Sequence, residues 1–168
     1  MNNELKLVRI DVEYCNYLRQ FDYRVPYNYN VKQIRPFIGV LFEVNNCKYF
    51  APLSSPKEKH LKLKNNLDLL KLDGGKLGVI NFNNMLPVQN NNIIVLDLNK
   101  ECLTESERKY QTLLKHQIYW LNRNNSMLLN RAKKLYDNYI SGKLNKAFFQ
   151  RCCNFKLLEE KCREYNNL

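Results

Sequence analysis

Hydrophobic positions follow two different periods along the chain. In the first hundred or so residues, apolar side chains occur in short runs or at alternate positions, which is typical of strands. From residue 104 onward they recur every three or four residues, which is typical of amphipathic helices. The first pattern predicts short strands at residues 5–10, 40–44, 47–51, 76–82, 85–88 and 93–98.

The clearest strand signal lies within residues 36–64. Its apolar side chains at every second position are Val40, Phe42 and Val44. Asn45 and Asn46 follow, and a second strand-like run occupies 47–51. A two-residue connection favours a primed turn, and asparagine tolerates the positive φ that such a turn needs. The pattern therefore predicts a β-hairpin.

Two prolines, Pro52 and Pro56, follow the hairpin and each removes a backbone donor. Because a strand ladder depends on those donors, we expect the ladder to stop there. Residues 65–72 alternate poorly and predict either a short helix or an irregular segment. The Asp-Gly-Gly sequence at 73–75 predicts a turn.

Four helices are predicted, one early in the chain and three after residue 104. The early helix should run to about residue 22. Glu107 lies where it can complete a capping box, and Gly142 fits the end of the third predicted helix. Candidate N-cap residues of the four helices are Asp11, Thr104, Ser126 and Asn154.

Length and composition suit one folded unit. The chain has 168 residues, and 45% of them are hydrophobic, which is enough to fill a single core. Short strands with tight turns, followed by helices, predict an α+β fold. We expect one domain spanning 1–168, built as a small, strongly curved antiparallel β-sheet or β-barrel with flanking and C-terminal helices.

The charge balance favours a polyanionic partner. Twenty-seven basic residues against sixteen acidic ones give a formal net charge of +11. Residues 1–103 hold 14 basic and 10 acidic groups, and residues 104–168 hold 13 and 6, so both parts are basic. Nucleic acid is the first choice of partner and an anionic membrane the second. A soluble domain with excess lysine is the ordinary alternative.

The sequence predicts a cytoplasmic protein without a membrane segment. No apolar run approaches the ~20 residues of a membrane span, and the N-terminus lacks a signal-peptide pattern. The six cysteines include no Cys-x-x-Cys pair. We therefore expect free thiols, most of them acting as small core residues.

Hydroxyl and basic side chains gather at the end of the predicted hairpin. Ser54 and Ser55 precede Pro56, and basic residues follow at once. The basic residues are Lys57, Lys59, His60, Lys62 and Lys64. A rigid element that carries hydroxyls and then cations suits a bound phosphodiester. The ordinary alternative is a structural turn, because Ser and Pro are common in turns.

RNA can be cleaved without a metal because its 2′-hydroxyl is a built-in nucleophile. The enzyme must orient that oxygen, move its proton, stabilise charge on the phosphoryl oxygens and protonate the leaving oxygen. Ser, Lys, Arg, Tyr and His suffice for this, and they cluster at 27–35 and 54–60. The sequence has no Gly-rich phosphate loop, no paired carboxylates at metal-binding or glycosidase spacing and no nucleophile elbow. Glu159 and Glu160, on the last predicted helix, are expected to be solvated or ion-paired. We predict no metal and no cofactor.

Several stretches together resemble one known family. They span residues 36–165 and follow the same order along the chain. The stretches are PFIGVLFEV, KYFAPLSSPKEKH, KLGVINFNNMLPV, VLDL and NFKLLEEKCREY. They resemble the ToxN/AbiQ family of bacterial endoribonuclease toxins, from type III toxin–antitoxin and phage-abortive systems.

This resemblance implies a fold, an activity and partners. The implied fold is a compact barrel related to the Kid/MazF-like toxins, with added helices. The implied activity is metal-independent RNA cleavage that leaves a 2′,3′-cyclic phosphate. The implied partners are a cellular or phage RNA substrate and an antitoxin RNA of repeated pseudoknots, held in a closed protein–RNA assembly.

The resemblance also implies catalytic residues. The family's hydroxyl–Ser–Pro–Lys motif falls on Ser54, Ser55, Pro56 and Lys57, with Ser54 where close relatives carry Thr. The family's histidine falls on His60. Tyr29 is preferred over Tyr27 as the family's tyrosine. Arg35 stands where relatives have Lys, which keeps the charge but not the ability to lose a proton.

The remaining candidates are expected to bind RNA. A basic helical flank beside tyrosines can line a nucleic-acid groove, although it can equally be an ordinary solvated face. The predicted RNA-binding residues are Tyr27, Lys32, Lys59, Lys62, Lys64, Arg108, Lys109, Lys115 and Arg123. A non-catalytic RNA-binding module remains the alternative. A DNA-binding regulator is weaker, because no pair of helices fits a recognition motif.

Overall fold

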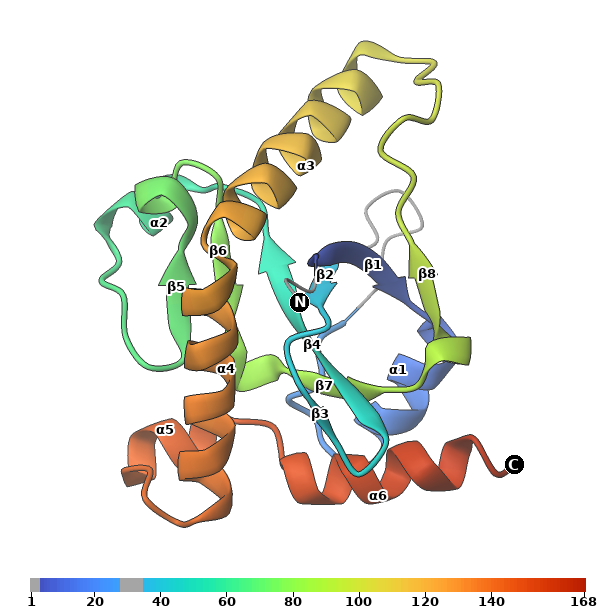
Figure 1. Ribbon diagram of the computed structural model, residues 1–168, viewed down its shortest axis with the longest axis vertical. Coiled ribbons are helices and arrows are strands. Elements are labelled where there is room, and N and C mark those ends of the chain that lie inside the picture. Colours follow the sequence, from blue (N-terminus) through green and yellow to red (C-terminus); the bar gives the residue numbers. More distant parts are fainter. Residues whose placement is uncertain (1–3, 28–34) are drawn as a thin grey trace.

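The computed structural model describes residues 4–27 and 35–168 (Figure 1). The strands are β1 (Lys6–Ile10), β2 (Phe37–Gly39), β3 (Glu43–Val44), β4 (Cys47–Ser54), β5 (Leu69–Lys71), β6 (Val79–Asn81), β7 (Leu86–Val88) and β8 (Ile93–Val95). The α-helices are α1 (Val12–Arg19), α2 (Glu58–Lys62), α3 (Glu105–Arg123), α4 (Asn125–Ile140), α5 (Lys146–Arg151) and α6 (Phe155–Tyr165). Short 3₁₀ turns are η1 (Leu72–Gly75), η2 (Phe82–Asn84) and η3 (Asn90–Asn92).

The sheet is antiparallel and is organised around β4. Its order is β5-β6-β4-β2-β1-β8, and β3 and β7 also pair with β4. The first half of β4 pairs with β3 and β7, whereas its second half pairs with β2 and β6. Because β4 has four partner strands, the sheet bends sharply at β4. The end of β4 lies between β2 and β6.

The predicted α+β class, antiparallel sheet and C-terminal helices are confirmed. The predicted barrel is not confirmed, because the sheet is not closed: β5 and β8 end the strand order and do not pair with each other among the described residues. Figure 1 shows β8 as a free edge on one side of the molecule and β5 beside α2 on the other.

The predicted hairpin is present between β3 and β4. Asn45 and Asn46 both adopt positive φ, 51° and 63°, as a primed two-residue turn requires. Val44 pairs directly with Cys47 across this turn. The first strand of the hairpin is shorter than predicted, since only Glu43 and Val44 are in ladder geometry.

Pro52 does not end the ladder, contrary to the prediction. β4 runs on to Ser54, and Pro52 pairs with Phe37 of β2. On the opposite edge, β4 pairs with β7 only as far as Phe50 and with β6 only from Leu53 onward. Pro52 falls between these two partners, where a missing N–H costs no ladder hydrogen bond.

Two further elements correct the sequence analysis. Residues 65–72 were expected to be a short helix or irregular, but Leu69–Lys71 form β5, paired with β6. The side chains of this strand do not alternate cleanly, because only Leu70 is fully buried. Helix α5 was not predicted, since its six residues bury none of their side chains fully and so leave no apolar period.

The helix caps agree closely with the sequence analysis. Asp11 caps α1, and Asn154 caps α6 by accepting from the backbone N–H of Leu157. Thr104 and Glu107 form the predicted capping box at the start of α3. The cap of α4 is Asn124 rather than Ser126, because α4 begins almost where α3 ends.

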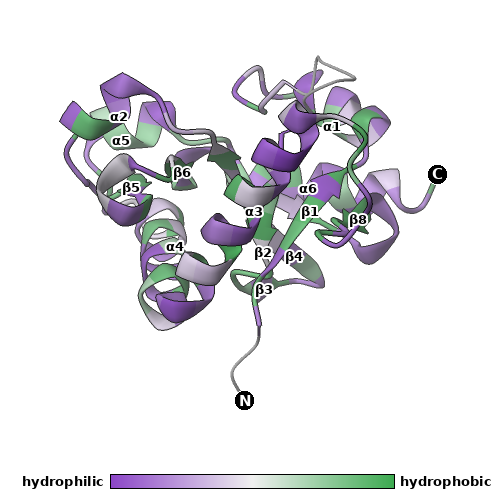
Figure 2. Cartoon of the chain, turned by 90° about the horizontal axis from the view of Figure 1, so that it is seen from above, coloured by the Kyte–Doolittle hydropathy of each residue, from purple (hydrophilic) through white to green (hydrophobic). Residues whose placement is uncertain are grey.

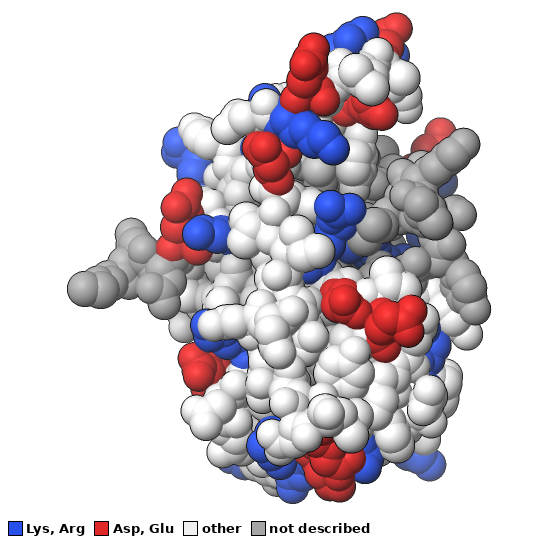
Figure 3. Space-filling model, turned by 90° about the vertical axis from the view of Figure 1, so that its right-hand side faces the viewer, with Lys and Arg blue, Asp and Glu red and all other residues white. Residues whose placement is uncertain are grey.

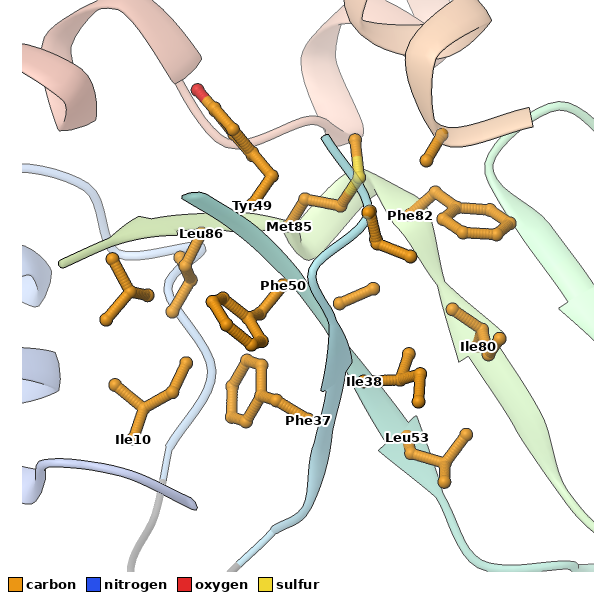
Figure 4. Close-up of a cluster of buried hydrophobic side chains, with 14 of the residues drawn as sticks. Ile10, Phe37, Ile38, Tyr49, Phe50, Leu53, Ile80, Phe82, Met85 and Leu86 are labelled. Carbon is orange, nitrogen blue, oxygen red and sulfur yellow. The ribbon is translucent and has the colours of Figure 1, made fainter. Parts of the chain in front are cut away.

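The core fills both sides of the bent sheet (Figure 4). Ile10, Phe37, Phe50 and Leu86 gather on one side, and Ile38, Leu53, Ile80 and Phe82 on the other. In Figure 2, hydrophobic colour is concentrated on the central strands, and the outer turns of the helices are more hydrophilic. Helix α6 packs against β4 and β7, and α3 packs against β1 and η1.

A buried carboxylate joins α6 to the sheet and to α4. Glu159 of α6 accepts hydrogen bonds from the hydroxyls of Tyr49 of β4 at 2.6 Å and Tyr136 of α4 at 2.7 Å. Burial, followed by the nearby carboxylate, raises the pKa of Tyr49, so this phenol stays protonated and donates. The sequence analysis treated Glu159 as a solvated or ion-paired residue, and its burial corrects that interpretation.

Candidate active site and nucleic-acid interface

The predicted catalytic segment, Ser54–Lys57, lies at the end of the central strand. Ser54 is the last residue of β4 and pairs with Val79 of β6. Ser55, Pro56 and Lys57 then leave the sheet, and all three are exposed. Two hydroxyls and an ammonium group are therefore presented to solvent directly beyond a strand that is buried along most of its length.

Gly78 fixes the backbone of this segment from below. A Cβ atom at position 78 would lie 1.9 Å from the carbonyl oxygen of Ser54, so no other residue fits without displacing it. Gly78 also has a φ of +102°, which side chains rarely tolerate. A Cβ atom at position 75 would likewise lie only 2.8 Å from the carbonyl oxygen of His60. The Gly-Gly-Lys-Leu-Gly stretch at 74–78 therefore supports the 54–60 segment.

His60 is buried beneath Lys57 rather than presented to solvent. Only 3% of its surface is exposed, and its Nδ1 accepts a hydrogen bond of 3.1 Å from the backbone N–H of Lys57. Burial lowers the pKa of His60, and the charges of Lys59 and Lys57 lower it further. A neutral imidazole can accept this bond, whereas a protonated Nδ1 cannot. His60 thus holds the backbone of Lys57 in place.

The end of α2 is fixed by a lysine that the sequence analysis did not single out. The Lys71 ammonium of β5 donates to the carbonyl oxygens of Leu61 at 3.0 Å and Leu63 at 2.9 Å. These carbonyls lie where helix α2 ends and lack helical partners. The predicted RNA-binding residues Lys59, Lys62 and Lys64 are all exposed along this segment.

Arg35 reaches the same end of the sheet from the strand beside β4. The backbone N–H of Leu53 donates a 2.9 Å hydrogen bond to the carbonyl of Pro36. Continuing this antiparallel register by one residue places Arg35 beside Ser54. Arg35 is half-buried, and burial lowers the pKa of its guanidinium. A cation held in a partly desolvated position binds an anion more strongly than one in open water.

The candidates before Arg35 are described only in part. Tyr29 and Lys32 lie outside the described residues. Tyr27 is described and exposed, and the guanidinium of Arg19 in α1 lies 4.1 Å from its ring centroid. Tyr29 therefore stays the predicted family tyrosine, in preference to Tyr27.

The four predicted basic residues of α3 share one side of the helix. At about 100° per residue, Arg108, Lys109, Lys115 and Arg123 fall within an arc of about 120°. Arg123 is held there by a 2.9 Å hydrogen bond to Tyr119. Lys109 lies at one margin of this side and pairs with Glu105 at 3.2 Å. The predicted cations therefore line one side of α3, and Lys109 is paired with an acid there.

Two features of the described residues bear on cofactors and membranes. Within 4–27 and 35–168, no group of three or more His, Cys, Asp or Glu side chains is arranged to hold a metal ion. None of the described helices has the length and apolar content that a bilayer-spanning segment requires.

Most of the chain also matches a known protein family. Residues 6–163 match the family described as toxin ToxN of the type III toxin–antitoxin system. This chain belongs to the ToxN family. The resemblance drawn from the APLSSPK and NFKLLEEK stretches is thereby confirmed over nearly the whole chain.

Curated relatives of the ToxN family align along almost the full length. The endoribonuclease ToxN of Bacillus thuringiensis subsp. kurstaki is 35% identical, over 95% of this chain and 84% of the relative. The endoribonuclease ToxN of Pectobacterium atrosepticum is 32% identical, over 96% and 94%. The endoribonuclease AbiQ of Lactococcus lactis subsp. lactis is 27% identical, over 96% and 90%.

Solved structures of the family share this fold. One comes from work on selective toxin inhibition by a non-coding RNA pseudoknot in type III systems, with a TM-score of 0.84, 32% identity and coverage of 99% of this chain and 100% of that one. Another is AbiQ, a lactococcal anti-phage endoribonuclease, with a TM-score of 0.82, 26% identity and the same two coverages.

Two residues that support the 54–60 segment in this ToxN-family protein were not predicted from the sequence. Gly78 has no side chain, the Lys71 ammonium binds backbone carbonyls, and both residues lie about 15–25 residues after the motif. A signal for Gly78 was present, since an isolated glycine at the start of a strand pattern often marks a close approach of two backbones. Lys71 gave no comparable signal, because its carbonyl partners are set by the tertiary fold.

Proposed function

We propose that this ToxN-family protein is an endoribonuclease toxin that cleaves RNA at the 54–57 segment. The 2′-hydroxyl of the substrate attacks the adjacent phosphorus, and the bond from phosphorus to the 5′-oxygen breaks. The products are a 2′,3′-cyclic phosphate and a 5′-hydroxyl. The 2′-proton leaves as the oxygen attacks, and one proton is delivered to the departing 5′-oxygen, so the step is balanced without a metal or a cofactor.

Each residue of the segment has an assigned role. Ser55 orients the attacking ribose or the scissile phosphate, and the hydroxyl of Ser54 supports it. Lys57 stabilises the negative charge that builds up on the phosphoryl oxygens and takes part in proton transfer. Tyr29, Arg35 and His60 are second-rank candidates for positioning or acid–base help.

One observation supports this proposal most strongly, namely the way the segment is held. The backbone at Gly78 packs so closely against the Ser54 carbonyl that a Cβ atom would clash there. His60 accepts a hydrogen bond from the backbone N–H of Lys57, so both ends of the segment are fixed. Catalytic groups need this kind of preorganisation, because a displacement of about 1 Å can cost ~10²-fold in rate. A turn that served only to reverse the chain would not need it.

The proposed partners follow from charge and from the relatives. The net charge of +11 suits RNA, and a solved relative comes from work on selective toxin inhibition by an RNA pseudoknot. We expect an antitoxin RNA of pseudoknot repeats to bind this chain in a closed protein–RNA assembly, and cellular or phage RNA to be the substrate. We expect a bacterial cytoplasmic location, which suits both the antitoxin RNA and the RNA substrate. The relation to the Kid/MazF-like barrels and a single domain over 1–168 remain predictions.

Substitution of Ser55 and Lys57 tests the proposal. Ser55→Ala and Lys57→Ala should each lower the single-turnover cleavage rate by about 10²–10³-fold, because each removes a group that acts mainly in the transition state. Both side chains are exposed, so circular dichroism should show an unchanged fold. A gel shift should show retained antitoxin RNA binding, because many other cations contact its backbone.

The control is Lys59→Ala, which removes an exposed cation two residues away. It should alter RNA affinity slightly and leave the cleavage rate of bound substrate nearly unchanged. If Ser55→Ala and Lys57→Ala fold, bind and cleave like the wild type, the active site lies elsewhere. If the wild-type protein binds RNA specifically but never cleaves it, the non-catalytic RNA-binding module is the better account.

A further inference from the structure

Arg9 lies in the same row of the sheet as the end of β4. Continuing the β1–β2 register by one residue places Arg9 opposite Pro36. The carbonyl of Pro36 accepts a hydrogen bond from the backbone N–H of Leu53 on β4. On the other side of β1, Arg9 pairs with Ile94 of β8. The row therefore runs from Leu53 through Pro36 and Arg9 to Ile94.

Arg9 also points to the same side of the sheet as this site. Side chains two residues apart on a strand share a face, so Arg9 lies on the side of Ile38 and Leu53 (Figure 4), opposite Ile10 and Phe37. Ser55 follows Leu53 by two residues and continues that side beyond the strand. Adjacent strands are about 4.8 Å apart, so the Cα atoms of Arg9 and Leu53 are separated by roughly 10 Å.

The guanidinium of Arg9 forms no ion pair among the described residues. Its Nε atom is buried without a hydrogen-bond partner in that part of the chain. The nearby acids are Asp11 and Glu13, which share a cavity of about 270 Å³ with Arg9. The Asp11 carboxylate accepts from the Tyr14 N–H at 2.9 Å, so it is occupied in capping α1.

Apolar side chains surround this cation at the free edge of the sheet. Ile94 is 57% exposed and Val95 55%, and Val12 at the start of α1 is 40% exposed. Ile94 and Val12 line the same cavity as Arg9. Figure 3 views the molecule from the side of β8 and shows a largely uncharged surface there, interrupted by a few basic and acidic groups.

An unpaired guanidinium beside exposed apolar groups matches the two parts of a nucleotide. The Nε atom is buried, but Arg9 as a whole is half-buried, and the planar fork formed by its terminal nitrogens suits bidentate phosphate contacts. The aliphatic side chains offer a surface on which the base or ribose can pack. We propose that Arg9 binds a backbone phosphate of single-stranded RNA next to the scissile one, with Ile94 beside the same nucleotide. This inference rests on the proposed function of the 54–57 segment.

The test compares a short and a long RNA substrate. A dinucleotide contains only the scissile phosphate, whereas a longer RNA also supplies the flanking one. For Arg9→Ala, we expect the concentration of long RNA at half-saturation to rise about tenfold, with an unchanged maximal single-turnover rate. The salt dependence of binding should fall by about one counterion. Cleavage of the dinucleotide should not change.

Two further variants and a binding measurement complete the design. Arg9→Lys keeps the charge but not the planar fork, so it should restore affinity only in part. Lys6→Ala removes an exposed cation of the same strand that points to the opposite side, so it should match the wild type. Fluorescence anisotropy of a 2′-O-methyl long RNA reports binding without cleavage, and the pseudoknot antitoxin RNA is titrated separately.

The outcomes separate this proposal from the proposed function. Equal affinity of wild type and Arg9→Ala for the long 2′-O-methyl RNA would overturn the phosphate site, whatever the cleavage assay shows. An equal loss on dinucleotide and long RNA would overturn it too, because Arg9 would then act on the catalytic segment itself. If only the antitoxin RNA loses affinity, the site does not serve the substrate. If the wild type cleaves neither RNA, the proposed function fails, and the anisotropy result still decides the role of Arg9.

Discussion

His60 shows how one buried side chain determines the position of an exposed one. Its Nδ1 accepts from the backbone of Lys57, and this bond requires a neutral ring. Lys57 itself is free to reach a phosphate. On this account, His60 acts by positioning Lys57, although the sequence analysis placed it among the candidates for acid–base help.

The substitution His60→Asn separates positioning from acid–base catalysis. Asparagine can place its Oδ1 where Nδ1 lies, but it cannot titrate. We expect His60→Asn to keep most of the cleavage rate, and His60→Ala to lose much of it. A loss of ~10²-fold or more in His60→Asn would instead indicate proton transfer by the imidazole.

The same residue predicts how stability depends on pH. The pKa of His60 is lower in the folded protein than its ordinary value of about 6.5, chiefly because the ring is buried. Below that value the unfolded chain binds a proton that the folded one does not, so the free energy of unfolding falls as pH decreases through this window. Urea unfolding at pH 7.5 and 5.5 should show a smaller decrease for His60→Asn than for the wild type. Identical decreases would contradict this.

At the scale of elements, the site depends on the contact between β6 and the end of β4. Gly78 lets the start of β6 approach the Ser54 carbonyl, and Val79 then pairs with Ser54. A side chain at 78 would push the catalytic segment away from its present position, without touching any reactive group.

Gly78→Ala should therefore lower the cleavage rate by about 10²-fold, because the hydroxyls of Ser54 and Ser55 would be displaced. Gly74→Ala is the matched control: Gly74 also has positive φ, +64°, but a Cβ there meets nothing within 4 Å. Both variants should lose about 1–2 kcal/mol of stability from backbone strain, and Gly78→Ala should lose more because its Cβ would also clash with the Ser54 carbonyl. Thermal unfolding measures both losses. Similar cleavage rates for the two variants would show that the Gly78 contact does not position the site.

At the scale of the whole molecule, buried hydrogen bonds connect the helices to the sheet. Glu159 joins α6, β4 and α4 through two tyrosine hydroxyls. Glu159→Ala should leave both hydroxyls without an acceptor, at about 1–3 kcal/mol each. Its neighbour Glu160 is largely exposed, so Glu160→Ala should change the free energy of unfolding by less than about 0.5 kcal/mol. Urea unfolding of the two variants measures this difference, and equal stabilities would contradict the role of Glu159.

Local features of this fold could be predicted from the sequence, whereas long-range ones could not. The Asn45-Asn46 turn and the Thr104 capping box depend on neighbouring residues, and both are confirmed. Glu159 looked like a surface residue because its partner Tyr49 lies 110 positions away. The motif itself was visible at 54–57, but the contacts that hold it come from residues brought near only by folding.

The central claim is that the substrate's own 2′-hydroxyl attacks at the 54–57 segment. The most direct measurement is single-turnover cleavage, in excess EDTA, of an RNA and of the same RNA with one 2′-deoxy nucleotide 5′ to the scissile bond. We predict rapid cleavage of the RNA to a 2′,3′-cyclic phosphate and no cleavage of the 2′-deoxy substrate at that bond. Cleavage of the 2′-deoxy substrate, a requirement for added metal, or products ending in a 3′-hydroxyl would contradict the account.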